Sequence, residues 1–144
     1  MKKNINIFVY GSLREGFFNY NIYLKDKVIS SKPAILKGMN LYHMPYKGYP
    51  AIIPGNGILK GEIIEVMDYE NTIKAIDKME GYISNRNINN EYHKELFEVE
   101  LENGKKESCY LYLYNTNIDE KFINEAIYIP DGDWPKYMKN INLQ

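Results

Sequence analysis

The clearest structural signal in this sequence is a β-hairpin in its second half. The dipeptide Asn103-Gly104 separates residues 91–102 from residues 105–115. An Asn-Gly pair between two extended runs favours the tight turn that joins antiparallel strands. The second run alternates tyrosines with apolar residues, which are Tyr110, Tyr112 and Tyr114 against Cys109, Leu111 and Leu113. This alternation predicts a strand with hydroxyl-bearing rings on one face and packed side chains on the other, so the fold must contain an antiparallel sheet.

Further strands are predicted in the first half of the chain. Residues 5–10 carry apolar side chains on both faces, which is typical of a central strand that is covered on both sides. Residues 28–44 have an extended pattern, and the prolines and glycines of residues 45–54 exclude a helix and predict a loop that crosses the surface or a cleft. Asn56-Gly57 then predicts a second hairpin turn, with residues 58–67 as the returning strand.

Three short helices are expected between these strands. Apolar residues recur at helical spacing in residues 20–24, 69–80 and 122–127, and Gly81 is placed to end the second helix. The chain of 144 residues is the usual length of one domain, so residues 1–144 are expected to form a single unit. Strands joined by short helices predict an α+β fold with a small mixed sheet that curls toward a barrel. The order of the strands is not predicted.

Composition narrows the partners and the compartment. The net charge is −1, from 18 Lys and Arg against 19 Asp and Glu, so no global field favours nucleic acid or an acidic membrane. No apolar run is long enough to span a bilayer, and the apolar stretch near the N-terminus is too short for a signal peptide. The single cysteine, Cys109, excludes an intrachain disulfide. We therefore expect a cytoplasmic protein without nucleic-acid or membrane partners, and its oligomeric state is not predicted.

Glu80 is the most informative polar residue. It falls between Ile73 and Ile76 on a helical wheel, on the face expected to be buried, and it stands in the last turn of the predicted helix. Burial and the partly negative helix terminus both favour the neutral carboxyl group, which raises its affinity for a proton. A general base that works near neutral pH needs this property. The alternative is that Glu80 extends from the helix end into solvent.

The segment Gly11-Ser12-Leu13 directly follows the first predicted strand. Successive backbone N–H groups of a tight turn can form a concave anion site, which would suit a carboxylate. The alternative is an ordinary turn between a strand and a helix. A phosphate loop is not supported, because the Lys-Ser/Thr ending of that motif is absent and Phe17-Phe18 stand in its place.

Other polar residues carry weaker signals. Ser12 lacks the Gly-x-Ser-x-Gly elbow of a hydrolase nucleophile, and only His43 and His93 could act as its base. Neither histidine has a partner at metal-ligand spacing, so no metal site is expected and both are interpreted as surface or hydrogen-bonded strand residues. The tyrosine row either reaches a ligand or packs in the core. Asp133 is expected to cap and Trp134 to pack.

An ordered set of short motifs resembles the γ-glutamylcyclotransferase family, in its small γ-glutamylamine-cyclotransferase-like branch. The resemblance covers nearly the whole chain. It rests on Phe8-Val9-Tyr10-Gly11-Ser12-Leu13-Arg14-x-Gly16-x-x-Asn19, Tyr49-Pro50-Ala51, Gly61-Glu62, Asp77-x-x-Glu80-Gly81-Tyr82, Tyr112-x-Tyr114 and Gly132-Asp133-Trp134.

The resemblance implies a mixed-sheet barrel with flanking helices and a pocket at the strand ends. It implies that Glu80 is the catalytic acid and base, that Tyr112 borders the pocket and that Pro50 lies in a loop covering it. The residues implied to form the substrate loop, whose amides take an α-carboxylate, are Tyr10, Gly11, Ser12 and Leu13.

The implied reaction releases 5-oxoproline and a free amine from a small-molecule γ-glutamyl amine or amino-acid derivative. The α-amine attacks its own γ-amide, and no cofactor or metal is needed. The alternatives are a non-catalytic small-ligand binding module on the same scaffold, and an esterase or amidase that uses Ser12.

Two local features bear on details of the site. Lys94 stands where relatives often have Arg, so it keeps the charge without the bidentate fork, and an ion pair there is left open. The asparagine-rich residues 83–90 are expected to shape the amine side of the pocket.

Overall fold

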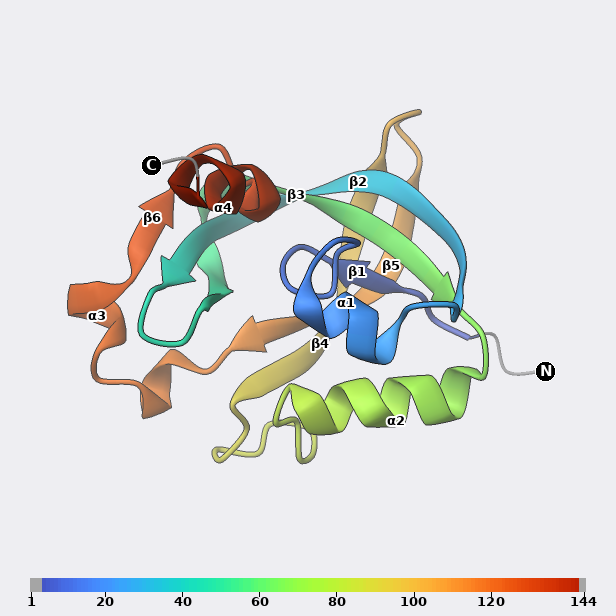
Figure 1. The fold of residues 1–144 in the computed structure, drawn as a ribbon, viewed down its shortest axis with the longest axis horizontal. Coiled ribbons are helices and arrows are strands. Elements are labelled where there is room, and N and C mark those ends of the chain that lie inside the picture. The colour runs from blue at the N-terminus through green and yellow to red at the C-terminus, as the bar shows by residue number, and fades with distance from the viewer. Residues whose placement is uncertain (1–3, 143–144) are drawn as a thin grey trace.

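Five strands close into a barrel in the computed structural model, which describes residues 4–142. The strand order is β3-β1-β5-β4-β2, and a long pairing of β2 with β3 completes the circle (Figure 1). Neighbours are antiparallel except β1 and β5, so the sheet is mixed. The expected α+β fold with a small mixed-sheet barrel is confirmed. The barrel strands are β1 (Ile7–Val9), β2 (Val28–Met44), β3 (Tyr49–Val66), β4 (Tyr92–Leu101) and β5 (Lys106–Tyr114).

Short helices flank the barrel. In Figure 1, α2 runs along the bottom of the molecule, α1 lies in front of the sheet, and α4 lies at the upper left. None of the helices in residues 4–142 is long and apolar enough to cross a membrane. The helical elements are α1 (Phe18–Tyr23), α2 (Tyr69–Met79), the 3₁₀ turn η1 (Thr116–Ile118), α3 (Phe122–Glu125) and α4 (Trp134–Asn142).

The two faces of β5 pack into two separate cores, as its alternating sequence predicts. Cys109, Leu111 and Leu113 join apolar residues from all five barrel strands and fill the barrel interior, together with Trp134 of α4. Tyr112 and Tyr114 face outward into a second core, where α2 packs against the sheet. The barrel interior is therefore solid, and any site must be built on its outer side or at its ends.

The hairpin formed by β2 and β3 differs from the sequence-based expectation. The chain turns at residues 45–48, and β3 then runs through both prolines, with Pro50 opposite His43 and Pro54 opposite Met39. This half of β3 pairs with β2 alone among the described residues. A strand with one unpaired edge tolerates residues that lack an N–H group. The predicted absence of a helix in residues 45–54 is confirmed, but the loop is limited to residues 45–48 and the rest of the segment is a strand.

The second misplaced element is the predicted turn at Asn56-Gly57. Residues 55–57 form an irregularity within β3, because Lys37 pairs with Ile58 while Met39 pairs with Pro54. The backbone N–H of Gly57 donates to Asn40 Oδ1 at 2.8 Å. Glycines near an asparagine suit a bulge as well as a turn, and here the long β2 pairing decides in favour of the bulge.

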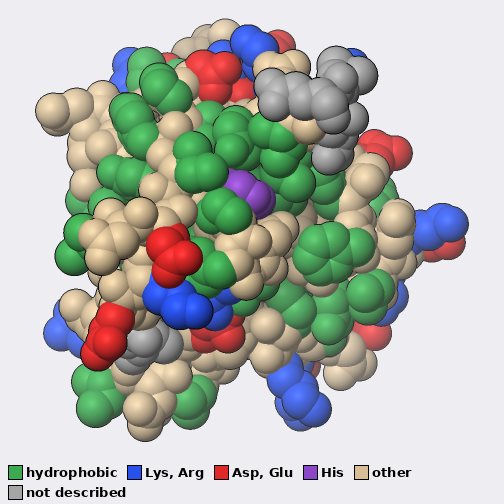
Figure 2. All heavy atoms as spheres, turned by 60° about the vertical axis from the view of Figure 1, so that its left-hand side comes forward, with side chains coloured by type: hydrophobic (Ala, Val, Ile, Leu, Met, Phe, Trp, Pro, Cys, Tyr) green, Lys and Arg blue, Asp and Glu red, His purple; other side chains and the backbone are tan. Residues whose placement is uncertain are grey.

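The C-terminal region also departs from expectation. The helix expected over residues 122–127 stops at Glu125, and β6 (Ile127–Ile129) follows it and pairs with residues 41–43 of β2. The helix α4 was not predicted. Its start matches the expectation for this segment, because Asp133 Oδ1 accepts a hydrogen bond from the Lys136 backbone N–H at 3.2 Å, and Trp134 is buried. Figure 2 brings the side carrying β6 and α4 forward, where hydrophobic and charged side chains are mixed at the surface.

Trp134 closes one end of the barrel, so we predict that Trp134→Ala lowers the free energy of unfolding by about 3–5 kcal/mol. The change removes a side chain that is 1% exposed and leaves His43 Nδ1 without the indole N–H that donates to it at 3.1 Å. Urea unfolding measures the loss. Ile123→Ala, at a side chain 90% exposed, is the control and should change the value by less than about 0.5 kcal/mol. Equal effects of the two variants would contradict the role given to Trp134.

Candidate active site

One pocket on the outer side of the barrel is lined by all the residues that the resemblance assigns to catalysis or to substrate binding. It has a volume of about 250 Å³ and lies between the end of β1, the C-terminal end of α2 and the starts of β3 and β4. The lining residues are Phe8, Val9, Tyr10, Gly11, Ser12, Leu13, Phe18, Asn19, Tyr49, Pro50, Met79, Glu80, Glu91, Tyr92 and Tyr112.

The loop after β1 forms one wall of the pocket. Its turn is closed by the Arg14 N–H, which donates to Gly11 O at 2.9 Å, and Asn19 Nδ2 donates to Ser12 Oγ at 2.7 Å. The backbone N–H groups of Ser12 and Leu13 make no hydrogen bond to any described residue. These two donors are therefore available to an anion in the pocket.

Pro50 contacts this loop from β3. A Cβ atom on Gly11 would lie 2.5 Å from Pro50 Cγ, so only glycine permits this approach. The Pro50 carbonyl accepts a hydrogen bond from Tyr92 Oη at 2.7 Å, which fixes its position. The resemblance implied that Pro50 lies in a covering loop. It lies instead within β3, because the hairpin turns before it.

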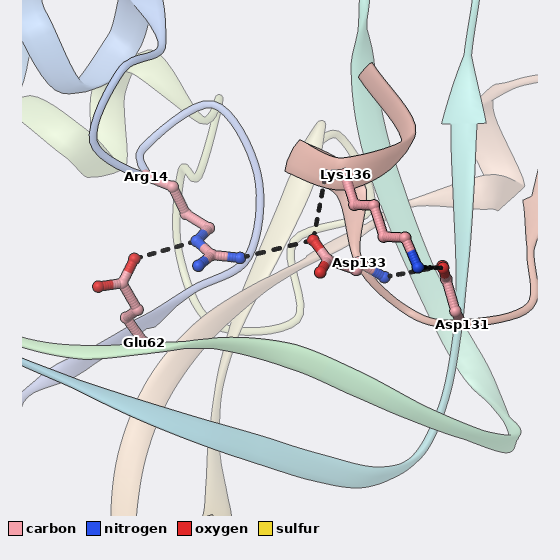
Figure 3. A network of polar contacts seen from close by, with 5 residues as sticks. All are labelled: Arg14, Glu62, Asp131, Asp133 and Lys136. Atoms are coloured by element: carbon pink, nitrogen blue, oxygen red, sulfur yellow. Dashed lines mark hydrogen bonds and ion pairs between the residues drawn. The ribbon is translucent and has the colours of Figure 1, made fainter. Parts of the chain in front are cut away.

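Arg14 anchors the same loop to two distant parts of the fold. Figure 3 shows its side chain between Glu62 and Asp133. Its Nε donates to Glu62 Oε1 at 3.0 Å, and its Nη1 lies 3.9 Å from Asp133 Oδ1, the oxygen that also caps α4. The loop that carries Ser12 and Leu13 is thus tied to β3 and to the start of α4.

Glu80 follows the last turn of α2 and lines the pocket instead of extending into solvent. Its backbone N–H donates to Ile76 O at 2.9 Å, and its carbonyl accepts from the Tyr92 N–H at 3.1 Å. The residue is partly exposed. Burial of its carboxyl group raises the pKa to about 8, and the negative charges of Glu91 and Asp77 add to this effect. A carboxyl group with this pKa can both accept and donate a proton near neutral pH.

Tyr112 contributes its ring to the pocket and its hydroxyl to a buried polar link. Tyr112 Oη donates to Asp77 Oδ1 at 2.6 Å, and burial raises the pKa of this phenol, so it stays protonated at neutral pH. Lys94 Nζ lies 3.2 Å from the same Asp77 oxygen. Lys94 therefore does form an ion pair. Tyr10 Oη donates to the Tyr112 carbonyl at 2.5 Å, which joins the end of β1 to β5.

Sequence reasoning missed a second carboxylate in the pocket, Glu91. Its Oε1 accepts a hydrogen bond from Tyr49 Oη at 2.5 Å and lies 3.8 Å from Lys47 Nζ. Glu91 stands at the start of a predicted strand, where charged residues are common, so no local signal distinguished it.

The asparagine-rich residues 83–90 do not line this pocket, contrary to expectation. Their loop is held by its own hydrogen bonds. Asn90 Oδ1 accepts from the Ile83 N–H at 2.6 Å, and Asn115 Nδ2 donates to the Asn90 carbonyl at 2.9 Å. Glu91, the residue that follows the loop, reaches the pocket in its place.

The two histidines lie away from Ser12. His43 is buried beside Trp134, and His93 Nδ1 is 3.2 Å from Asn90 Nδ2. Neither lines the pocket, so the described residues offer no histidine base to a Ser12 nucleophile. No group of three or more His, Cys, Asp or Glu residues between positions 4 and 142 is arranged to hold a metal ion.

Comparison with known proteins identifies the family to which this chain belongs. The model of the family described as "Gamma-glutamyl cyclotransferase, AIG2-like" matches residues 7–136, and the chain belongs to this family. The resemblance drawn from the motifs is confirmed. A curated protein of Niallia circulans, named gamma-L-glutamyl-butirosin B gamma-glutamyl cyclotransferase, is 31% identical over 134 residues, which are 92% of this chain and 76% of that protein.

Two further proteins are similar over nearly their whole length. A protein of Methanocaldococcus jannaschii, provisionally named a gamma-glutamylcyclotransferase, is 31% identical over 91% of this chain and 96% of its own. The crystal structure of an uncharacterized protein from Pyrococcus horikoshii has a TM-score of 0.63 over 98% of both chains, at 24% identity, and shows the same fold. The family and the relatives' names support an enzyme with γ-glutamyl cyclotransferase activity.

The raised pKa of Glu80 predicts a pH-dependent effect on stability. The folded state keeps the Glu80 proton up to about pH 8, whereas the unfolded chain releases it near the ordinary value of 4.5. Glu80 therefore favours the folded state least at alkaline pH, since stability falls with rising pH wherever the folded state binds more protons. Glu80→Gln should match the wild-type Tm near pH 4.5 and exceed it by roughly 15 °C at pH 8.5.

Thermal unfolding followed by circular dichroism across this pH range measures the difference. Glu70→Gln, at an exposed residue in the first turn of α2, makes the same chemical change outside the pocket and is the control. A Tm difference for Glu80→Gln that does not grow with pH would contradict the buried position of the carboxyl group.

Proposed function

We propose that this protein cyclises the γ-glutamyl group of a γ-glutamyl amine or amino-acid derivative, releasing 5-oxoproline and a free amine. Glu80 is the general acid and base. The observation that carries the proposal is the placement of a carboxyl group with a pKa of about 8 in the same pocket as a loop with free backbone donors. These are the two groups that a γ-glutamyl substrate requires, one for its α-ammonium and one for its α-carboxylate.

The loop after β1 binds the α-carboxylate in this proposal. Ser12 and Leu13 offer their backbone N–H groups, and Tyr10 and Gly11 place the loop against the pocket. Charged acceptors strengthen hydrogen bonds from backbone donors. The ties of Arg14 to Glu62 and Asp133 hold the loop still, and a rigid loop lowers the entropy lost when substrate binds.

Proton transfer through Glu80 completes the reaction. The ionised Glu80 removes one proton from the α-ammonium, and the free amine attacks the γ-carbonyl carbon. A new C–N bond closes the five-membered lactam, and the bond from that carbon to the leaving nitrogen breaks. Glu80 gives this proton to the leaving nitrogen, and the second proton that the α-nitrogen loses when it becomes the lactam nitrogen passes to the leaving nitrogen as well. The product amine therefore leaves as an ammonium, with the charge that the α-ammonium brought in. One carboxyl group serves both steps because its pKa lies near the working pH.

The remaining requirement is substrate conformation. The attacking and leaving groups belong to one molecule, so the pocket has to hold the folded conformer in which the α-amine approaches the γ-carbonyl. Tyr112 and Pro50 line the pocket together with the loop and Glu80. The reaction transfers no electrons and needs no cofactor.

The relatives bear on the substrate class. The name of the Niallia circulans relative gives its substrate as γ-L-glutamyl-butirosin B. This supports a γ-glutamyl group carried on another molecule as the substrate here, and disfavours a purely binding function on the same scaffold.

We predict that Glu80→Gln lowers the release of 5-oxoproline by about 10²- to 10⁴-fold, because glutamine keeps the shape of the side chain and cannot transfer the proton. Mass spectrometry of 5-oxoproline from a panel of γ-glutamyl amines and γ-glutamyl amino acids measures the rate. Glu70→Gln should retain wild-type turnover. Wild-type rates in a folded Glu80→Gln protein would exclude Glu80 as the acid and base.

We also predict that kcat/KM in the same assay decreases as the pH is lowered. For the wild type, kcat/KM should rise with pH and level off above about pH 8, because the free enzyme must bind substrate with Glu80 ionised. Initial rates at low substrate concentration from pH 5.5 to 9.5 measure this dependence. A profile that is flat over this range would assign the essential base to another group.

A further inference from the structure

The charged side chains that line the pocket are both carboxylates. Among the described lining residues, Glu80 and Glu91 have carboxyl groups, and no Lys, Arg or His is present. A γ-glutamyl group brings one positive and one negative charge of its own. In the proposed reaction the loop after β1 meets the α-carboxylate and Glu80 meets the α-ammonium. Glu91 then supplies a second negative charge, and the γ-glutamyl group has no second positive charge to pair with it.

Glu91 is fixed in place through one of its two oxygens. Tyr49 Oη donates to Oε1 at 2.5 Å, and Lys47 Nζ lies 3.8 Å from that same oxygen. Oε2 makes no hydrogen bond with any described residue. The Glu91 side chain is 37% exposed, so it can be reached from solvent. At 3.8 Å, and partly in solvent, Lys47 offsets the charge of Glu91 only in part.

The backbone sets Glu91 directly beside the catalytic carboxyl group. The Glu91 N–H donates to Gly81 O at 3.0 Å, and the Tyr92 N–H donates to Glu80 O at 3.1 Å. A Cβ atom on Gly81 would lie 2.8 Å from Glu91 Cβ, so glycine is required for the two segments to approach. Glu80 is the more buried of the two carboxyl groups and Glu91 the more exposed. When the reacting amide lies at Glu80, the leaving half of the substrate is therefore placed next to Glu91.

We propose that Glu91 is a specificity residue that selects γ-glutamyl amines whose leaving half carries a second positive charge, and that it disfavours leaving halves that carry a carboxylate. This proposal rests on the proposed cyclotransferase reaction. An ammonium group a few carbons beyond the scissile amide would pair with Glu91 Oε2. The apolar lining residues Phe18 and Met79 suit the methylene chain between the two groups. A carboxylate in the same place would be repelled.

Three synthetic substrates of equal length test the charge preference. They are the γ-glutamyl amides of 1,4-diaminobutane, n-butylamine and 4-aminobutyrate, whose leaving halves are cationic, neutral and anionic. For the wild type, kcat/KM for 5-oxoproline release should fall in that order, with about tenfold between the cationic and the anionic substrate. A preference of this size corresponds to a partly exposed ion pair.

Two variants should move the preference in opposite directions. Glu91→Gln keeps an oxygen for Tyr49 Oη and removes the charge, so the ratio of kcat/KM for the cationic over the anionic substrate should approach one. Lys47→Gln removes the cation beside Glu91, so the same ratio should rise. Glu95→Gln, at an exposed residue of β4 outside the pocket, is the matched control and should keep the wild-type ratio.

The outcomes separate the two proposals. Release of 5-oxoproline from all three substrates, with an unchanged ratio in Glu91→Gln, would overturn the specificity role and leave the reaction intact. An equal loss on all three substrates would also overturn it, because Glu91 would then act on the glutamyl half. No 5-oxoproline from any γ-glutamyl compound would overturn the proposed function itself.

Discussion

The pairing of β2 with β3 is the interaction on which the rest of the molecule depends. It extends from Val28 opposite Val66 to Met44 opposite Tyr49, and it closes the sheet into a barrel. Closure removes the open edges that an isolated mixed sheet would have. It also brings the start of β3 to the end of β1, so that Pro50 contacts Gly11. A site residue is therefore positioned by the strand pairing that forms the barrel.

The barrel strands have two covered faces, and the site belongs to the outer one. The inner face is filled by side chains from all five strands and sealed by Trp134. The outer face packs against α2, whose C-terminal end brings Glu80 to the pocket. The carboxyl group lies at a helix end, close to Glu91 and Asp77, where its ionised form is disfavoured by burial and by both charges. The folded structure keeps the Glu80 carboxyl group in this position, so ionising it remains unfavourable for as long as the protein is folded.

Short sequence patterns correctly predicted those parts of the fold that depend on residues close together in the chain. The Asn103-Gly104 hairpin, the helix that ends at Gly81 and the burial side of Glu80 follow from turn preference and helical spacing, which act over a few residues. Asn56-Gly57 misled because a bulge and a turn use the same residues, and only the distant strand β2 distinguishes them. Residues 127–129 became a strand because the edge of β2 was free to pair with them. Glu91 gave no signal because its position depends on the contact between the start of β4 and the end of α2.

The size of the pocket has a consequence for what the protein can process. A cavity of about 250 Å³ is smaller than those that enclose drug-sized ligands, and one of its lining residues, Glu91, is partly exposed to solvent. A site of this size binds one end of a molecule, and the rest of that molecule stays in solvent. In the proposed reaction the γ-glutamyl group is a small terminal cap, so the size of the molecule that carries it places no demand on the barrel.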